Sequence, residues 1–406
     1  MQFVKNNIKD TEVIVRGIEL SSLAAGIRYK DRLDLCLIKI KGLSNSAVRF
    51  TSNRFPAAPI IISKKHLNKK EPKYLLINAG NANAATGQKG ENDTTDICRK
   101  ISKLAGCEIE EVLMFSTGVI GELLPANKII SCLPKLFETS TQTGWREAAK
   151  AIMTTDTFPK ISLKEFQLDG QKYSLVGICK GSGMIQPKMA TMLAFVATDL
   201  PLSRKALDVI SEVALSESFN KITVDGETST NDSFVLISTN SENTSLLDID
   251  DPSFSLVKSL ISECCKELAI DIVKDGEGAT KLVNIRVNGA ESDEEAKLIA
   301  SSIANSLLVK TAIFAEDPNW GRIFSAIGAS GAENIKQDKI DIFIGGIRIC
   351  NHGKGVEDLD ELEVISAMKL RNFDILVELN IGSFSADTWT CDLSYDYIKI
   401  NAEYRS

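Results

Sequence analysis

One stretch of the chain, KGSGMIQPKMATMLAFVATD at 180–199, joins two segments of opposite character. The glycines and proline of its first half predict a loop, because glycine permits a positive φ and proline fixes φ. The nearly continuous apolar run at 192–196 is typical of a strand buried on both faces. The hydroxyl of Thr191 is therefore expected where a glycine loop enters a rigid strand, which is a suitable place for a nucleophile.

The composition is that of a globular protein. The 406 residues are 44% hydrophobic and 25% charged, which is enough to bury a large core in two or three domains. The net charge of −7, with no long basic or acidic block, argues against a nucleic-acid footprint and against a membrane-surface patch. Residues 1–17 are too polar for a signal peptide, and no apolar run approaches membrane-spanning length. We therefore expect a cytoplasmic protein.

Cysteine and histidine offer little chemistry in this chain. The nine cysteines are scattered, odd in number and without a CxxC pair, which predicts buried free thiols rather than disulfides or a zinc site. The two histidines are His66, in a lysine-rich stretch expected to be solvated, and His352, in a turn. So little histidine favours chemistry that needs none. We expect no metal and no bound cofactor.

Strands and helices alternate along the chain, with small-residue turns between them. The expected elements are strands at 74–77, 112–115 and 173–178, a helix over 126–153 with a weak break around Pro134, a helix opened by a Ser292–Glu295 capping box, a hairpin at 342–350 and strands within 375–400. The glycine loops match neither GxGxxG nor GxxxxGK[ST], so a Rossmann or P-loop site is not indicated. The pattern predicts an α/β or α+β chain with layered sheets.

The segment KGSGMIQPKMATMLAF resembles the self-cleaving segment of the ornithine acetyltransferase family. The members of this family are glutamate N-acetyltransferases. Pattern alone would favour an ordinary loop-to-strand junction. The resemblance extends in family order over nearly the whole chain, through NAGNANAATG, STGVIG, TTDTFPK, DGEGATK, EDPNWGR and INAEYRS. Gln186 and Lys188 replace the alanine and asparagine of the family pattern, and Ser406 replaces a threonine. The implied fold is a layered α/β sandwich of the N-terminal-nucleophile aminopeptidase-like type, with a larger N-terminal and a smaller C-terminal domain.

This resemblance implies that the chain cuts itself between Ala190 and Thr191, into an alpha chain of residues 1–190 and a beta chain of residues 191–406. The new α-amine, with an ordinary pKa of about 7.7–8.0, would then activate the Thr191 hydroxyl as the nucleophile. The implied reaction moves an acetyl group from N-acetylornithine to glutamate through an acetyl-Thr191 ester, in arginine biosynthesis. Some family members also make N-acetylglutamate from acetyl-CoA as a co-substrate, and the sequence leaves that second activity open.

The same resemblance assigns further site residues. Thr117 and Gly118 of STGVIG would form the oxyanion hole, where one donor typically supplies ~3–4 kcal/mol. The implied substrate-binding residues are Thr154, Lys180, Thr191, Glu277, Asn401 and Ser406. Lys180 is a suitable point charge for the substrate carboxylate, and Glu277 for the ornithine ammonium. Taken alone, either charge would be an ordinary solvated side chain.

The implied assembly is a heterotetramer of two alpha and two beta chains that binds small-molecule substrates and neither nucleic acid nor membrane. Two alternatives stay open. An N-terminal-nucleophile aminopeptidase or amidase would use the same self-cleavage but pass its acyl group to water. A non-catalytic amino-acid-binding protein would stay uncut and would be unaffected by Thr191→Ala.

Overall fold

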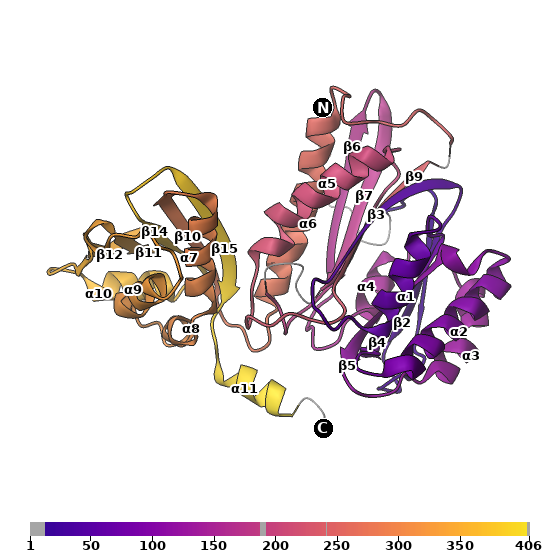
Figure 1. Ribbon diagram of the computed structural model, residues 1–406, viewed down its shortest axis with the longest axis horizontal. Helices are drawn as coiled ribbons and strands as arrows, with labels where there is room; N and C mark the ends of the chain where they lie inside the picture. Colours follow the sequence, from indigo (N-terminus) through magenta and orange to yellow (C-terminus); the bar gives the residue numbers. More distant parts are fainter. Residues whose placement is uncertain (1–12, 187–191, 241, 404–406) are drawn as a thin grey trace. The chain divides into compact units, whose positions relative to one another are not determined.

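The computed structural model describes residues 13–186, 192–240 and 242–403. The chain forms two compact units (Figure 1). Unit 1 comprises residues 1–181, 188–220 and 228–272, and unit 2 comprises residues 182–187, 221–227 and 273–406. The larger unit is thus built mainly from the N-terminal part of the chain and the smaller one from the C-terminal part, as predicted. The stretch at 180–199 contributes to both units.

Unit 1 contains two mixed sheets. The first has the order β1-β2-β4-β5, in which β4 and β5 are parallel and the other neighbours antiparallel. The second has the order β3-β9-β8-β7-β6, in which β9 and β8 are parallel and the other neighbours antiparallel. The strands are β1 (Ile18–Leu23), β2 (Leu35–Ile40), β3 (Leu43–Phe50), β4 (Tyr74–Asn81), β5 (Val112–Val119), β6 (Lys160–Leu168), β7 (Gln171–Lys180), β8 (Leu193–Thr198) and β9 (Ser233–Asn240).

The main core of unit 1 lies between these two sheets, because both turn apolar side chains toward it. Phe115 of β5 meets Phe195 of β8 edge to face, with ring centroids 5.2 Å apart, and Trp145 is buried in the same core. The helices are α1 (Ala58–Leu67), α2 (Gly87–Ala105), α3 (Ala126–Glu138), α4 (Trp145–Ala151), α5 (Arg204–Glu217) and α6 (Phe254–Lys274). Apolar residues of α2 and α3 cover the outer face of the first sheet, and α6 packs on the second sheet where Gly177 leaves room for Leu268. This layering confirms the predicted α/β sandwich.

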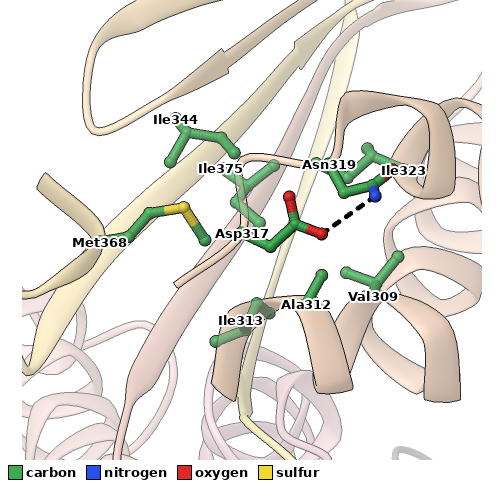
Figure 2. A pocket seen from close by; sticks show the side chains of 9 residues that line it. All are labelled: Val309, Ala312, Ile313, Asp317, Asn319, Ile323, Ile344, Met368 and Ile375. Atoms are coloured by element: carbon green, nitrogen blue, oxygen red, sulfur yellow. Dashed lines mark hydrogen bonds between the residues drawn. The ribbon is translucent and has the colours of Figure 1, made fainter. Parts of the chain in front are cut away.

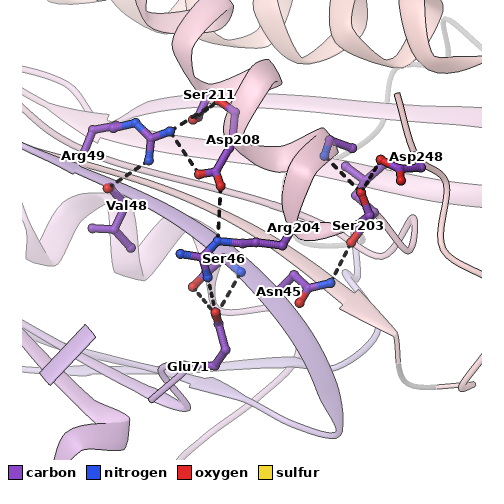
Figure 3. Close-up of polar contacts among 12 residues, drawn as sticks. Asn45, Ser46, Val48, Arg49, Glu71, Ser203, Arg204, Asp208, Ser211 and Asp248 are labelled. Atoms are coloured by element: carbon purple, nitrogen blue, oxygen red, sulfur yellow. Dashed lines mark hydrogen bonds and ion pairs between the residues drawn. The ribbon is translucent and has the colours of Figure 1, made fainter. Parts of the chain in front are cut away.

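A polar network on the surface of unit 1 fixes α5 against β3 (Figure 3). Arg204 of α5 forms ion pairs with Glu71 and Asp208, and Arg49 of β3 also reaches Asp208, at 3.1 Å. Glu71 in turn accepts hydrogen bonds from the backbone N–H and the hydroxyl of Ser46. Because these charges are partly solvated, each pair stabilises the fold by only ~0–1 kcal/mol. The network is structural and contains no predicted site residue.

Unit 2 is built on one mixed sheet of order β13-β12-β11-β14-β10-β15. Its strands are β10 (Leu282–Ala290), β11 (Asp341–Ile344), β12 (Ile347–Asn351), β13 (Lys354–Gly355), β14 (Asn372–Glu378) and β15 (Phe384–Cys391), and its helices are α7 (Asp293–Asn305), α8 (Leu307–Phe314), α9 (Trp320–Gly328), α10 (Glu361–Met368) and α11 (Tyr395–Ala402). The inward residues of β10 pack with those of α7 in the core. The β11–β12 hairpin confirms the prediction for 342–350.

Three local expectations need correction. The helix predicted over 126–153 is two helices, but Pro134 lies inside α3 and the break comes at 139–144, where backbone hydrogen bonds join Thr141 to Leu20 of β1. The C-terminal stretch is strand-rich only up to β15, and the chain then forms α11, which Ser394 caps. The capping box at α7 is half formed: Ser292 caps the helix, but the side chain of Glu295 accepts hydrogen bonds from Asn334 instead.

No helix within residues 13–186, 192–240 and 242–403 has by itself the length and apolar character to cross a bilayer. Only α7 and α8 taken together reach that length and composition, and they are bent by 56° at the break between them.

Candidate active site

Three strands of the second sheet in unit 1 meet at one level. Lys180, the last residue of β7, pairs with Leu193, the first residue of β8, and Leu193 pairs with Ser233 at the start of β9. The start of β8 therefore has a hydrogen-bonded neighbour on each side. The predicted nucleophile Thr191 and its cleavage partner Ala190 come just before this point and lie outside the described residues.

Thr117 and Gly118, the predicted oxyanion pair, stand near the end of β5 in the first sheet. They pair with Ala79 and Gly80 of β4. The ammonium of Lys180 donates a 3.2 Å hydrogen bond to the hydroxyl of Thr117, and both side chains are buried. The two sheets thus bring together a residue predicted to stabilise the oxyanion and one predicted to bind substrate.

Asp156 is the centre of a buried polar cluster beside these residues. Its Oδ2 accepts a hydrogen bond from the backbone N–H of Thr154 at 2.9 Å. Its Oδ1 accepts from the ammonium of Lys160 at 2.7 Å and from the backbone N–H of Gly181 at 2.8 Å. Burial alone would raise the pKa of Asp156, but the charges of Lys180 and Lys160 outweigh it and hold the pKa well below its ordinary value. The cluster ties Thr154, a predicted substrate residue, to the end of β7.

A second polar link joins the start of β9 to both sheets. The side-chain amide of Asn231 donates to the carbonyl oxygens of Ala82, at 2.7 Å, and Ser116, at 2.9 Å. The next residue, Asp232, accepts the backbone N–H of Met192 at 3.1 Å through Oδ1. Two consecutive residues, Asn231 and Asp232, therefore link the strand ends of the first sheet to the start of β8.

Sequence reasoning missed Asp156, Asn231 and Asp232. Neither the carboxylate of TTDTFPK nor the polar residues ahead of β9 match a catalytic or binding motif. The links of these three residues to distant segments, from Asp156 to Gly181, from Asn231 to Ala82 and Ser116 and from Asp232 to Met192, leave no local pattern in the sequence. The one local signal is that polar residues directly precede β9, every residue of which is buried.

Glu277 and Asn401, the predicted substrate residues of unit 2, are in direct contact. The side-chain amide of Asn401, on α11, donates to Glu277 Oε2 at 2.8 Å. Glu277 is buried, and its backbone N–H donates to the carbonyl of Ser182 at 2.8 Å. Gly183 lies against the Glu277 carboxylate so closely that an added Cβ would be 2.5 Å from it. Ser406 lies outside the described residues.

Each of the two histidines takes part in contacts that stabilise the local fold. His66 is buried on α1, where its Nδ1 lies 2.7 Å from the carbonyl oxygen of Val112. The expectation of a solvated His66 side chain is wrong, because α1 exposes its lysines to solvent and buries the imidazole ring. His352 occupies a turn with a φ of 49°, and its backbone N–H donates to Asp341. All nine cysteines are free and seven of them are buried, as predicted.

A small pocket in unit 2 is separate from the predicted site residues (Figure 2). Its lining consists of Val309, Ala312, Ile313, Asp317, Asn319, Ile323, Ile344, Met368 and Ile375. The two polar side chains of the lining are hydrogen-bonded to each other: the Asn319 amide donates to Asp317 Oδ2 at 3.0 Å. We assign no catalytic role to this pocket.

Comparison with known proteins connects these features to a family. A protein-family model described as the ArgJ family matches residues 19–406. The chain belongs to the ArgJ family. A member from Methylococcus capsulatus, named arginine biosynthesis bifunctional protein ArgJ, is 43% identical over 401 residues, which cover 98% of each chain. A member of the same name from Gluconobacter oxydans is 44% identical over 393 residues, covering 97% of this chain and 92% of its own.

Membership in the ArgJ family confirms the predicted resemblance to the ornithine acetyltransferases. The chain is accordingly an acyltransferase of arginine biosynthesis. The crystal structure of an ArgJ from Bacillus halodurans is 40% identical, and the match covers 52% of this chain and 98% of that one, with a TM-score of 0.48. The roles of individual residues and the cut at 190/191 remain predictions.

Proposed function

We propose that this ArgJ protein cuts itself between Ala190 and Thr191 and then transfers an acetyl group from N-acetylornithine to glutamate through an ester on Thr191. The hydroxyl attacks the acetyl carbonyl, ornithine leaves, and the amine of glutamate takes the acetyl group from the ester. The freed α-amine of Thr191 acts as the base, because its ordinary pKa lies near working pH.

The observation that carries this proposal is the hydrogen bond between Lys180 and Thr117 at the point where β8 begins. The proposed nucleophile is two residues before Leu193, so the chain itself keeps Thr191 close to this strand end. Thr117 and Gly118 are proposed to bind the developing oxyanion, through the hydroxyl of the first and the backbone N–H of the second.

The charges of unit 1 suit an amino-acid substrate. Asp156 is a buried carboxylate beside two buried lysines, Lys160 and Lys180, whose charges lower its pKa. A buried ammonium group such as that of Lys180 can donate charge-assisted hydrogen bonds to a ligand carboxylate. Thr154 and Lys180 are proposed to contact that carboxylate.

Unit 2 is proposed to supply residues for the ornithine ammonium. Glu277 is a buried carboxylate held by Asn401, and such a group favours a cationic ligand. Ser406 is proposed to contact substrate as well, on the family resemblance.

The cut chains are proposed to stay associated, as heterodimers that pair into a heterotetramer. Support for the first step comes from the second sheet of unit 1, which takes β3, β6 and β7 from residues before the cut and β8 and β9 from residues after it. The junctions β3–β9 and β7–β8 pair strands of the two predicted chains along their length. Backbone pairing and a shared apolar core would hold the two chains together without a peptide bond.

The proposal is tested by incubating the purified protein with N-acetylornithine, with and without glutamate. Formation of N-acetylglutamate and ornithine supports transfer, whereas free acetate alone would indicate an amidase. Thr191→Ala should remain one full-length chain and lose transfer, and Thr191→Ser, which keeps a hydroxyl, should retain measurable cleavage. A fully active Thr191→Ala variant would contradict the proposal and favour a different nucleophile.

The members with which this chain shares 43–44% identity are named bifunctional, and we propose the same of this chain. The second activity would acetylate glutamate from acetyl-CoA. Incubation with acetyl-CoA and glutamate, without acetylornithine, should yield N-acetylglutamate and free CoA. A chain active with acetylornithine and inert with acetyl-CoA would be monofunctional.

A further inference from the structure

Asp225 contacts three segments of unit 2 that are far apart in the sequence. Its Oδ2 accepts the backbone N–H of Met184 at 2.6 Å, and its Oδ1 accepts that of Ile185 at 2.9 Å. Oδ1 also accepts the N–H of Glu227 at 3.2 Å, and the hydroxyl of Tyr397, on α11, donates to Oδ2 at 3.4 Å. One carboxylate therefore joins the loop that follows β7, its own turn and the last helix of unit 2.

The loop after β7, residues 182–185, has a backbone conformation that needs support. Met184 has a φ of 57°, which a residue with a side chain adopts at a cost, so surrounding contacts must stabilise it. The carbonyl of Ile185 accepts hydrogen bonds from the backbone N–H of Val224 and the hydroxyl of Thr223, each at 2.9 Å. The loop is therefore held on its N–H groups and on its last carbonyl.

This loop and α11 both contact Glu277, the buried carboxylate proposed to bind the ornithine ammonium. The N–H of Glu277 donates to the carbonyl of Ser182 at 2.8 Å, and Gly183 lies directly against the carboxylate. On the side of α11, the amide of Asn401 donates to Glu277 Oε2 at 2.8 Å. Asp225 therefore holds two segments that together fix the backbone and the carboxylate of Glu277.

The contact between Asp225 and α11 is made by a phenol that keeps its proton. Burial raises the pKa of Tyr397 above its ordinary value, and the negative charges of Asp225, Glu277 and Glu227 raise it further. The hydroxyl therefore stays a hydrogen-bond donor. Asn401 lies four residues later on the same face of the helix, and its amide also donates to the carbonyl of Tyr397 at 3.0 Å.

We propose that Asp225 is a positioning residue for the acetylornithine half of the reaction, because it fixes the loop and the helix that direct the Glu277 carboxylate toward the ornithine ammonium. The inference rests on the proposed function. Asp225 acts through Glu277, and no bond to substrate is assigned to it. N-acetylornithine has an ammonium at the end of its side chain, whereas glutamate has a carboxylate there. The half-reaction with glutamate should therefore depend on Asp225 much less.

The test compares Asp225→Asn with the wild type in both halves of the transfer. When an acyl-enzyme separates the two halves, kcat/KM for the donor reports the first half and kcat/KM for the acceptor reports the second. Asparagine has one acceptor oxygen in place of two, so one N–H of the loop loses its partner. The value for N-acetylornithine should fall by about five- to tenfold, and the value for glutamate by less than about twofold.

Asp387 provides the matched control, because it anchors the same segment of unit 2. The ammonium of Lys221, in the segment 221–227 that contains Asp225, forms an ion pair with Asp387 of β15 at 2.5 Å. Asp387→Asn should lower the melting temperature slightly and leave both values of kcat/KM unchanged. An equal loss in both half-reactions of Asp225→Asn, or no loss in either, would overturn the proposal.

A milder variant covers the case in which Asp225→Asn does not fold or does not cut itself. Tyr397→Phe keeps the ring and removes the hydroxyl that donates to Asp225, so it should lower kcat/KM for N-acetylornithine by about twofold and spare the value for glutamate. Wild-type values of both constants in Tyr397→Phe would then overturn the role of Asp225. These outcomes in variants of an active wild-type protein contradict this inference alone. A wild-type protein that transfers no acetyl group from N-acetylornithine contradicts the proposed function as well.

Discussion

At the scale of single residues, Asp156 supplies a negative charge beside two buried lysines of unit 1, Lys160 and Lys180. The side chains of Asp156 and Lys160 are 0% exposed, so neither charge is balanced by water. The carboxylate also holds the backbone N–H groups of Thr154 and Gly181. One side chain therefore supports both the packing and the positions of the proposed substrate contacts.

Asp156→Asn should destabilise unit 1 by about 3–5 kcal/mol, because it removes one partner of a fully buried ion pair with Lys160. The pKa of Asp156 is depressed in the folded protein, so its contribution is present above the unfolded pKa of about 3.9 and is lost as pH falls toward the folded pKa. Urea denaturation at pH 7 should show the full difference in the free energy of unfolding between variant and wild type, and this difference should narrow below about pH 4.

The control is Asp208→Asn, which alters a partly solvated ion pair in the α5 network and should change the free energy of unfolding by less than about 1 kcal/mol. Equal effects of the two variants would contradict the assignment.

Gly118 cannot carry a side chain where it stands. Its φ is 132°, and an added Cβ would lie 2.3 Å from the carbonyl carbon of Gly80 and 2.5 Å from the nitrogen of Asn81. Gly118→Ala should therefore push the ends of β4 and β5 apart, with a loss of several kcal/mol of stability and at least about tenfold in kcat. Gly121→Ala is the control, since Gly121 has a φ of 85° but open space around it, and it should cost only about 1 kcal/mol. Thermal melting measures the loss of stability in both variants, and steady-state kinetics measure the loss of kcat. Equal losses in the two variants would contradict the prediction.

At the scale of elements, the second sheet of unit 1 organises the proposed site, because β7, β8 and β9 bring Lys180, Met192 and Asp232 to one level. Local patterns could predict the strands at 112–115 and 173–178, because short runs rich in apolar and β-branched residues need no distant information. They could also predict the end of α2, where Gly106 has the left-handed conformation that stops a helix. They could not predict α11, since none of its residues is buried and it carries no apolar period.

The sheet also predicts how the cut protein behaves. Fragments 1–190 and 191–406 should co-elute as one complex in size-exclusion chromatography, because β3–β9 and β7–β8 pair strands from both. They should separate only in denaturant, where the shared core between the two sheets is lost. Separation of intact, folded fragments in plain buffer would contradict this topology. The elution volume also reports whether two such pairs associate.

At the scale of the whole molecule, the predicted cut and the division into units do not coincide. The larger division between the units comes after residue 272, far along the sequence from the predicted cut at 190/191. The predicted substrate residues are likewise distributed, with Thr154 and Lys180 in unit 1 and Glu277 and Asn401 in unit 2. The family resemblance could predict these residues individually. Sequence alone could not predict the role of Asp156, because its short-range contacts with Thr154 and Lys160 match no motif and its bond to Gly181 joins separate segments of the chain.

The most direct test of the account is a rapid quench of the protein with N-acetylornithine labelled in its acetyl group, followed by peptide mapping. The account predicts a fragment that begins at Thr191 and carries one labelled acetyl group on the oxygen of that residue, formed before N-acetylglutamate appears. Turnover that proceeds at its normal rate while no label is ever found on Thr191 would contradict it.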